Sequence, residues 1–203
     1  MHANGASPLT PAEIRSLPGP RRVDRLRKAL RHGTLAPSAV AEDLDAWVAL
    51  FRADSQAALR VLVLELLESV DDPRVDDLAE RALKDRGDGV RLEALRLLLD
   101  RHPDRTDALA RAHLEDDGIE VRMLAAERLH ALDPDTAIDA LFAGVRAEAH
   151  GPREAHALDR TMEFFVEDVA DPALVPRLRA LVDDVEDPEE MIPWAIESLE
   201  GTP

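Results

Sequence analysis

Two residue types recur with a fixed period along most of the chain. Three aspartates and four arginines are each spaced 31 residues apart, namely Asp54, Asp85 and Asp116 with Arg60, Arg91, Arg122 and Arg153. In the first three cases the arginine follows its aspartate by six residues. A repeat of this length is one supersecondary unit, which buries its apolar face only by stacking on its neighbours. The period therefore constrains the chain to a stack of similar units.

The sequence between the repeated residues has the pattern of α-helices. Segments between Pro73, Pro103 and Pro134 carry apolar residues at helical spacing, and Asp, Gly or Pro bounds each segment. Two helices and no strand signal in each unit of 31 residues indicate an antiparallel helix hairpin. We therefore expect an all-α fold, an α-solenoid that forms a right-handed superhelix of about five hairpins with an N-terminal helical cap.

The expected helices follow from these boundaries. A short helix is predicted over 11–17 and a longer one over 21–32. Five hairpins are predicted to follow, at 39–53 with 55–70, 73–86 with 88–102, 104–116 with 118–132, 134–149 with 152–169, and 172–184 with 188–200. The expected domain organisation is a flexible N-terminus with a short helix (1–20), a basic capping helix and linker (21–38) and a repeat domain (39–203).

The central units resemble HEAT repeats, in the short form shared with bilin-lyase-type HEAT-like families. That pattern has an acidic residue at the end of the first helix, then Val-Arg, then Ala and Leu at helical spacing, then Asp-Pro. The matching residues are Asp85, Val90, Arg91, Ala94 and Leu98, then Asp116, Val121, Arg122, Ala125, Leu129, Asp133 and Pro134, and finally Asp171, Pro172, Pro176 and Leu178. The resemblance covers about residues 40–200 and implies a HEAT-like fold, but it implies little about function.

The repeated Asp and Arg residues have a structural interpretation as a ladder of ion pairs. Each Asp is expected near a turn and each Arg in the first turn of the second helix, so that they bridge within or between hairpins. We expect Arg91 at such a joint, near Asp85 or near an aspartate of the adjacent unit. The ladder weakens toward the C-terminus, because Ala147 stands six residues before Arg153. Loss of Arg153 should therefore cost less stability than loss of Arg91.

The charge of the chain is unevenly distributed. The 203 residues hold 42 acidic and 25 basic residues, which gives a net charge of −17. Residues 1–41 contain seven basic and two acidic residues, a net +5, so the remainder carries −22. Such a body repels nucleic-acid phosphates, and six aromatic residues without Tyr form a poor base-stacking surface. We expect no nucleic-acid partner.

Several classes of chemistry lack their required residues. The absence of Cys excludes disulfides, thiolate metal sites and a thiol nucleophile. The sequence contains no Gly-rich phosphate loop, nucleophile elbow or HExxH motif. It also lacks a run of about 20 apolar residues and a secretory signal, so we expect a cytoplasmic protein that does not enter membranes.

One His-containing segment leaves an enzymatic alternative open. Glu148, His150, Glu154 and His156 lie close together in the sequence. The deoxyhypusine hydroxylases, which are HEAT-repeat enzymes, bind di-iron through His-Glu dipeptides, but the order here is Glu-Ala-His with a Gly-Pro turn between. We therefore expect no metal and no cofactor. The alternative is a HEAT-like enzyme or a lyase-like protein that handles a cofactor or ligand.

The basic segment over 21–32 has an apolar stripe of Val23, Leu26, Ala29 and Leu30. We interpret it as an N-terminal cap for the first hairpin, since the end of a stack must be covered. An acidic partner and a membrane surface are the alternatives for its cations, and the membrane is disfavoured because the stripe is short and lacks an aromatic anchor.

The predicted function is that of a non-catalytic HEAT-repeat scaffold or adaptor that binds an unidentified protein. We expect a monomer whose stacked second helices line a concave binding face. Candidate contact residues on those helices are Arg96, Asp100, Arg101, Glu127, Arg128 and His130.

Overall fold

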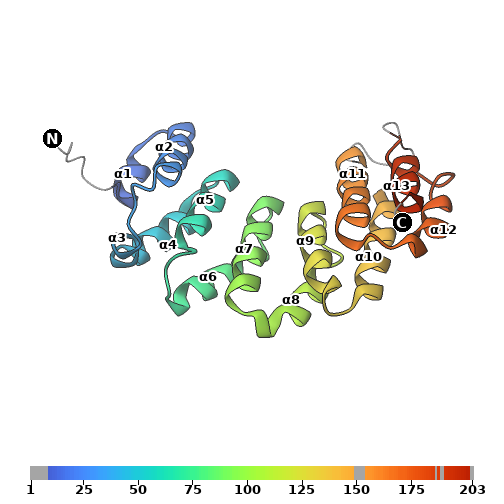
Figure 1. Cartoon of the computed structure of the whole chain (residues 1–203). Helices are drawn as coiled ribbons and strands as arrows, with labels where there is room; N and C mark the ends of the chain where they lie inside the picture. Colours follow the sequence, from blue (N-terminus) through green and yellow to red (C-terminus); the bar gives the residue numbers. More distant parts are fainter. Residues whose placement is uncertain (1–8, 149–153, 186, 188–189, 202–203) are drawn as a thin grey trace, which may run out of the picture. The chain divides into compact units, whose positions relative to one another are not determined.

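The protein is all-α in a computed structural model that describes residues 9–148, 154–185, 187 and 190–201 (Figure 1). Within these residues there are helices and turns and no strand, so the prediction of an all-α protein is confirmed. The chain divides into two compact units, residues 1–103 and residues 104–203. In the part that the structure describes, no helix has the length and apolar character needed to cross a membrane.

The first unit is a set of short helices packed in chain order. They are α1 (Pro11–Ser16), α2 (Gly19–Arg31), α3 (Pro37–Glu42), α4 (Leu44–Ala53), α5 (Ala57–Leu67), α6 (Pro73–Ala82) and α7 (Asp88–Arg101). Helix α4 packs on α5 and α6 packs on α7, while α5 also contacts α2 and α7. In Figure 1, α5 lies between α2 and α7. The core of this unit therefore runs between consecutive helix pairs.

Local sequence signals determine where these helices begin and which face they bury. Thr10 and Glu13 form a capping box at the start of α1. Asp72 caps α6 by accepting a hydrogen bond from the Arg74 N–H, and Pro73 occupies the first helical position. Helix α6 buries the stripe Val75, Leu78, Ala79 and Ala82. Helix α2 buries Val23, Leu26 and Ala29, three of the four residues of its predicted apolar stripe.

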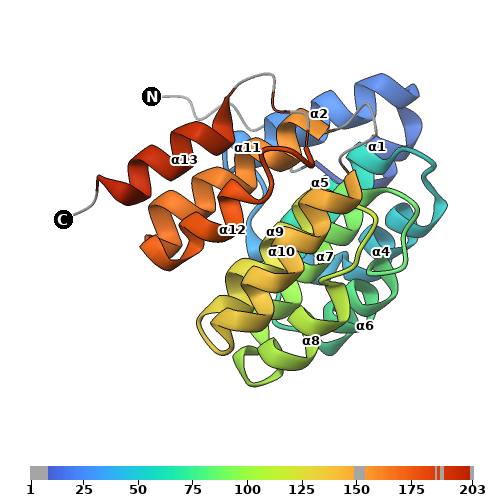
Figure 2. The same ribbon diagram turned by 90° about the vertical axis from the view of Figure 1, so that its right-hand side faces the viewer.

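The second unit continues the same pattern of helix pairs. A 3₁₀ turn (Pro103–Arg105) spans the boundary between the units. The elements that follow it are α8 (Thr106–His113), α9 (Ile119–His130), α10 (Pro134–Glu148), α11 (Glu154–Phe164), a π-helix (Phe165–Val169), a 3₁₀ turn (Pro172–Leu174), α12 (Val175–Arg179) and α13 (Met191–Glu200). Helix α9 contacts α8, α10 and α11, and α13 contacts α11 and α12. Figure 2 shows α9 and α10 side by side.

Three predicted helices are interrupted or shortened in the structure. The helix expected over 172–184 is reduced to a 3₁₀ turn (Pro172–Leu174) followed by a short α-helix (Val175–Arg179). The helix expected over 39–53 is divided into α3 and α4 at Asp43, whose backbone (φ −100°, ψ 15°) is not helical. Asp43 ends α3, and its carbonyl oxygen accepts the first hydrogen bonds of α4. The helix expected over 152–169 becomes a π-helix at Phe165 and ends at Ala170, which has φ +48°. The wider π turn allows the adjacent Phe164 and Phe165 to be buried together, at 5% and 0% exposure.

Arg60 and Asp85 form the central ion pair of the first unit. Nε and Nη2 of Arg60 donate hydrogen bonds of 2.9 and 2.7 Å to the two carboxylate oxygens of Asp85. The Arg60 side chain is 8% exposed and that of Asp85 is 15% exposed. Burial raises the pKa of Asp85, but the hydrogen bonds from Arg60 and Gly87 outweigh it, and the pKa is lowered. The pair ties α5 to the turn between α6 and α7.

Each aspartate of the repeat also shapes its own turn, with the same geometry in both units. Oδ1 of Asp54, Asp85 and Asp116 accepts a hydrogen bond of 2.7–2.9 Å from the backbone N–H two residues later. The carbonyl oxygen of the same residue accepts one from Nη1 of the arginine six residues later, at 3.0, 2.8 and 2.6 Å for Arg60, Arg91 and Arg122. The Asp-x5-Arg spacing thus closes the turn that precedes α5, α7 or α9. Arg153 lies outside the described residues.

Arg22 of α2 binds the carboxylate of Asp54, the first aspartate of the repeat, as Arg60 binds that of Asp85. Its Nη1 donates a 2.6 Å hydrogen bond to Oδ2 of Asp54, whose side chain is 2% exposed. Its Nε and Nη2 donate to the carbonyl oxygens of Leu17 and Arg15, at 2.8 and 3.0 Å. Helix α2 therefore provides the cation for a buried carboxylate. The 31-residue period does not predict this residue, because Arg22 precedes Arg60 by 38 positions.

Replacing Arg60 with Met should destabilise the protein by about 3–5 kcal/mol, because the substitution leaves a largely buried Asp85 carboxylate without its bidentate partner. Arg74→Met is the matched control, since Arg74 bonds Asp72 and Asp45 with a side chain that is 50% exposed. That variant should keep a urea midpoint close to that of the wild type. Equal urea midpoints for the two variants would contradict the claim that the buried Arg60–Asp85 pair stabilises the protein more than the exposed pairs of Arg74 do.

Candidate functional site

An open groove in the second unit is the main candidate for a binding site. It has a volume of about 730 Å³ and lies between α8 and α10, bounded by the turn that leads into α9. Its lining residues are Arg111, Ala112, Leu114, Glu115, Asp117, Arg122, Thr136, Asp139, Ala140, Ala143, Gly144 and Ala147. Ligand sites commonly have volumes of about 300–1,000 Å³, so this groove is large enough to receive a ligand or a segment of a partner.

Small residues on one face of α10 form the floor of the groove. Ala140, Ala143, Gly144 and Ala147 follow the spacing i, i+3, i+4 and i+7, which places them along one side of the helix. A Cβ atom at Gly144 would lie 3.5 Å from Nε of Arg122, in ordinary contact. The Arg122 side chain therefore lies against Gly144, while the short, exposed side chains of Ala143 and Ala147 leave that part of α10 accessible to a ligand.

Arg111 lies at the side of the groove that α8 forms. Its Nε donates a 2.9 Å hydrogen bond to Asp107, and its Nη2 donates a 2.7 Å bond to Asp133. Thr136 also donates to Asp133 through its hydroxyl and its backbone N–H. The hydrogen bond from Arg111, followed by those from Thr136, lowers the pKa of Asp133 to about 2. The Arg111 side chain is thereby held in one position at the groove wall.

Arg122 begins α9 and lines the inner end of the groove. Its Nη1 donates a 2.6 Å hydrogen bond to the carbonyl oxygen of Asp116, and its Nη2 atom is inaccessible to solvent. Burial lowers the pKa of Arg122, while the nearby carboxylates Asp116 and Asp117 act in the opposite direction. The groove therefore contains a half-buried cation as well as the exposed Arg111.

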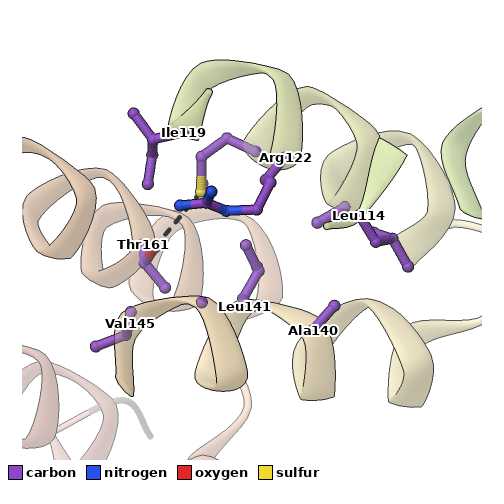
Figure 3. Close-up of a pocket in the computed structure, with 10 residues that line it drawn as sticks. Leu114, Ile119, Arg122, Ala140, Leu141, Val145 and Thr161 are labelled. Atoms are coloured by element: carbon purple, nitrogen blue, oxygen red, sulfur yellow. Dashed lines mark hydrogen bonds between the residues drawn. The ribbon is translucent and has the colours of Figure 1, made fainter. Parts of the chain in front are cut away.

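A second, much smaller cavity lies beneath Arg122. Figure 3 shows Arg122 between α9 and α10 with Leu141 and Thr161, and Thr161 donates a 3.5 Å hydrogen bond to the sulfur of Met123. The cavity volume is about 10 Å³, which is the size of one water molecule. It is too small for an organic ligand, so the open groove is the relevant site.

Acidic residues balance the two arginines of the groove. Glu115 and Asp117 lie in the loop between α8 and α9, and Asp139 lies on α10. Asp139 pairs with Arg177 at 2.8 Å, and the guanidinium of Arg177 lies 4.0 Å from the ring centroid of Phe142. The groove thus has charges of both signs around a floor of small side chains, a composition suited to a polypeptide.

On α7, the sequence-predicted contact residues are engaged within the chain. Nη2 of Arg96 donates hydrogen bonds of 2.6 Å to Glu93 and 3.0 Å to Glu68, and Asp100 lies 3.6 Å from Nη1. The hydrogen bonds that Arg96 donates to Glu93 and Glu68 raise the pKa of Arg96. The structure therefore brings Arg96 and Asp100 together in an ion-pair network that also holds α5 to α7.

Arg101, which was also predicted as a contact residue, is held within the first unit. Its side chain is 17% exposed, with Nε 2.7 Å from Asp76 and Nη1 donating a 2.9 Å hydrogen bond to the carbonyl oxygen of Val70. The end of α7 lies against the start of α6 and the loop before it, which the helical pattern of α7 alone does not reveal. Arg101 thus contributes to packing in the first unit.

The α9 candidates differ in accessibility. Arg128 is exposed, whereas Glu127 and His130 are half-buried. Burial raises the pKa of Glu127, and Nη2 of Arg160 lies 3.9 Å from its carboxylate. His130 packs edge-on against Phe164, with 5.6 Å between ring centroids. Arg128 is therefore the most accessible of the three.

The groove itself was not predicted from the sequence. The signal for it is the spacing of Ala140, Ala143, Gly144 and Ala147, which marks a helix face without large side chains. Ala147 is also the residue 31 positions after Asp116, where the repeat would otherwise place an aspartate. The groove thus lies where the sequence departs from the repeat. From the sequence alone, Ala147 predicts only weaker ion pairing near the C-terminus.

No candidate metal centre is found in the described part of the chain, where no three His, Asp or Glu side chains are arranged to hold an ion. The side chains of Glu148, His150, Glu154 and His156 lie outside the described residues, so the structure does not test that cluster.

Comparison of the chain with protein-family models, curated proteins and solved structures found no match. The described residues define an all-helical protein with a ligand-sized groove in its second unit. Its function is therefore inferred from geometry and charge.

Replacing Arg111 with Gln should raise the pKa of Asp133 from about 2 toward its ordinary value, because the largest cause of the lowered pKa is removed while the Thr136 hydrogen bonds remain. A carboxylate with a lowered pKa stabilises the fold above the pKa it has in the unfolded chain, and the effect is lost as the pH falls through the folded value. The variant should therefore lose less stability on acidification. NMR titration of the side-chain carboxyl groups measures the change.

Asp72 is the internal control for this titration, since Arg74 holds its pKa at about 2 in the other unit. It should titrate identically in the wild type and in Arg111→Gln. An unchanged Asp133 titration in the variant would show that Arg111 does not hold that carboxylate.

Proposed function

We propose that the protein is a non-catalytic HEAT-like scaffold or adaptor, and that the groove between α8 and α10 receives a segment of a partner protein. The observation that carries the proposal is the open groove of about 730 Å³ with small residues along its floor. A peptide that lies there contacts α10 at Ala143 and Ala147, while Arg111 and Asp117 offer charges of both signs to its polar groups.

The proposal includes the finer architecture expected from the sequence, an α-solenoid of about five hairpins that winds as a right-handed superhelix. Supporting contacts join α4 to α5, α6 to α7, α8 to α9, α10 to α11, and α12 to α13. The Asp-x5-Arg turn, with its repeated hydrogen bonds, is a second support. Solenoids of this kind present extended binding surfaces, which suits a scaffold.

Arg96, Asp100, Glu127, Arg128 and His130 belong to the same proposal as a further contact region. Of these residues, Asp100 and Arg128 have the exposure that a direct contact needs. Arg96 and Asp100 act there as part of their ion-pair network. We further propose that the protein is monomeric and cytoplasmic, with a protein rather than a nucleic acid or membrane as its partner.

Filling the groove tests the proposal directly. Ala143 is exposed on the groove floor, and Ala143→Trp places a large ring where the partner segment would lie. Ala180→Trp is the matched control, because Ala180 is exposed in the same unit and does not line the groove. Affinity capture from native lysate should recover a stoichiometric protein with the wild type and the control, and lose it with Ala143→Trp.

Circular dichroism and urea midpoints establish that both Trp variants remain folded. Equal recovery of the same protein by all three forms would refute binding in the groove. If capture with the wild-type protein recovers no other protein, that result would count against the adaptor function itself.

A further inference from the structure

Helix α2 has two faces with different roles. Its inward face buries Val23, Leu26 and Ala29, and Arg22 reaches from it to the Asp54 carboxylate. Its outward face carries five exposed cations, namely Arg21, Arg25, Arg27, Lys28 and Arg31. Covering the first hairpin requires the inward face and Arg22, so packing does not account for the outward cations.

Three of these cations line a second surface groove. Arg21, Arg25 and Lys28 surround it with Asp24 and the half-buried Leu17, and its volume is about 290 Å³. Within the described residues, none of the three cations forms a hydrogen bond or ion pair with another side chain, whereas Arg27 lies 3.9 Å from Asp24. The groove therefore combines one apolar side chain with three cations whose charge is available to a partner.

The spacing of the cations suits a short acidic segment. Arg21, Arg25 and Lys28 stand at i, i+4 and i+7, so they extend about 10 Å along one side of α2 at 1.5 Å per residue. Carboxylates on a partner helix repeat at the same spacing, and arginine binds a carboxylate through two parallel hydrogen bonds. An apolar residue between the carboxylates would contact Leu17.

A nucleic acid fits this surface less well. Neither α1 nor α2 contains an aromatic residue on which bases could stack. Residues 42–203 carry a net charge of −22, which repels any polyanion longer than the basic patch. A compact acidic segment gains the attraction of the patch and meets less of this repulsion.

We propose that the outward face of α2 binds an acidic, amphipathic segment of a partner protein, with its carboxylates on Arg21, Arg25 and Lys28 and an apolar residue on Leu17. This surface belongs to the first unit and is separate from the groove between α8 and α10. The Ala143→Trp variant leaves it unchanged, so either proposal can fail without the other.

The test uses the full chain and a fluorescein-labelled helical peptide of Glu and Leu residues at helical spacing, with binding followed by fluorescence anisotropy. The variant R21E/R25E/K28E reverses the three groove cations. R52E/R81E/K84E is the matched control, because it reverses two exposed arginines and one exposed lysine elsewhere in the same unit. Both variants change the net charge by the same amount.

The wild type should bind the peptide, and raising the salt concentration should weaken binding because the contacts are charged. R21E/R25E/K28E should lose about tenfold or more in affinity, which corresponds to about 1.4 kcal/mol, while the control changes little. A peptide with Ser in place of Leu should bind more weakly, since it cannot contact Leu17. A single-stranded oligonucleotide of equal length should bind less tightly than the acidic peptide.

Three results would overturn the proposal. The first is a wild-type Kd no tighter than about 1 mM for the acidic peptide. The second is an equal loss of affinity in both triple variants, which would reflect overall charge. The third is tighter binding of the oligonucleotide than of the peptide, which would identify a nucleic-acid surface instead.

Discussion

The bidentate hydrogen bond between Arg60 and Asp85 is the interaction on which the packing of the first unit depends. Both side chains are largely buried, so each charge must be paired in a defined geometry. Arg60 also bonds the Asp54 carbonyl, and Asp85 also accepts from the Gly87 N–H. One pair of residues therefore links α5 to the turn before α7. This link fixes the register between consecutive helix pairs.

Departures from the repeat identify the surfaces that are available for binding. At the N-terminal end, Arg22 satisfies Asp54 from outside the period, which leaves the outward cations of α2 accessible to an acidic segment. In the second unit, Ala147 stands where the period would place an aspartate, and it lines the groove between α8 and α10. Residues that keep the period close the turns between helices, and one of them, Arg122, also lines the groove. Both proposed binding surfaces lie where the period ends or changes.

The sequence was sufficient for the helical class and for the Asp-x5-Arg turn, because apolar spacing and a repeated polar pair are local signals. It was insufficient for Arg101, whose burial against Asp76 and the Val70 carbonyl depends on packing between helices. The π-helix at Phe165 was also not predicted, since tertiary burial of two adjacent aromatic rings decides it. The groove needed the structure, because small residues on α10 indicate a groove only when the position of α8 is known.

A double-mutant cycle on Arg60 and Asp85 tests the central claim most directly. The free energies of unfolding of the wild type, Arg60→Met, Asp85→Asn and the double variant give the coupling between the two side chains, free of their separate contacts. The buried bidentate geometry predicts a favourable coupling of about 2–3 kcal/mol, at the upper end of the range for contacting residues. A coupling below about 0.5 kcal/mol would show that the pair does not fix the register of the helices.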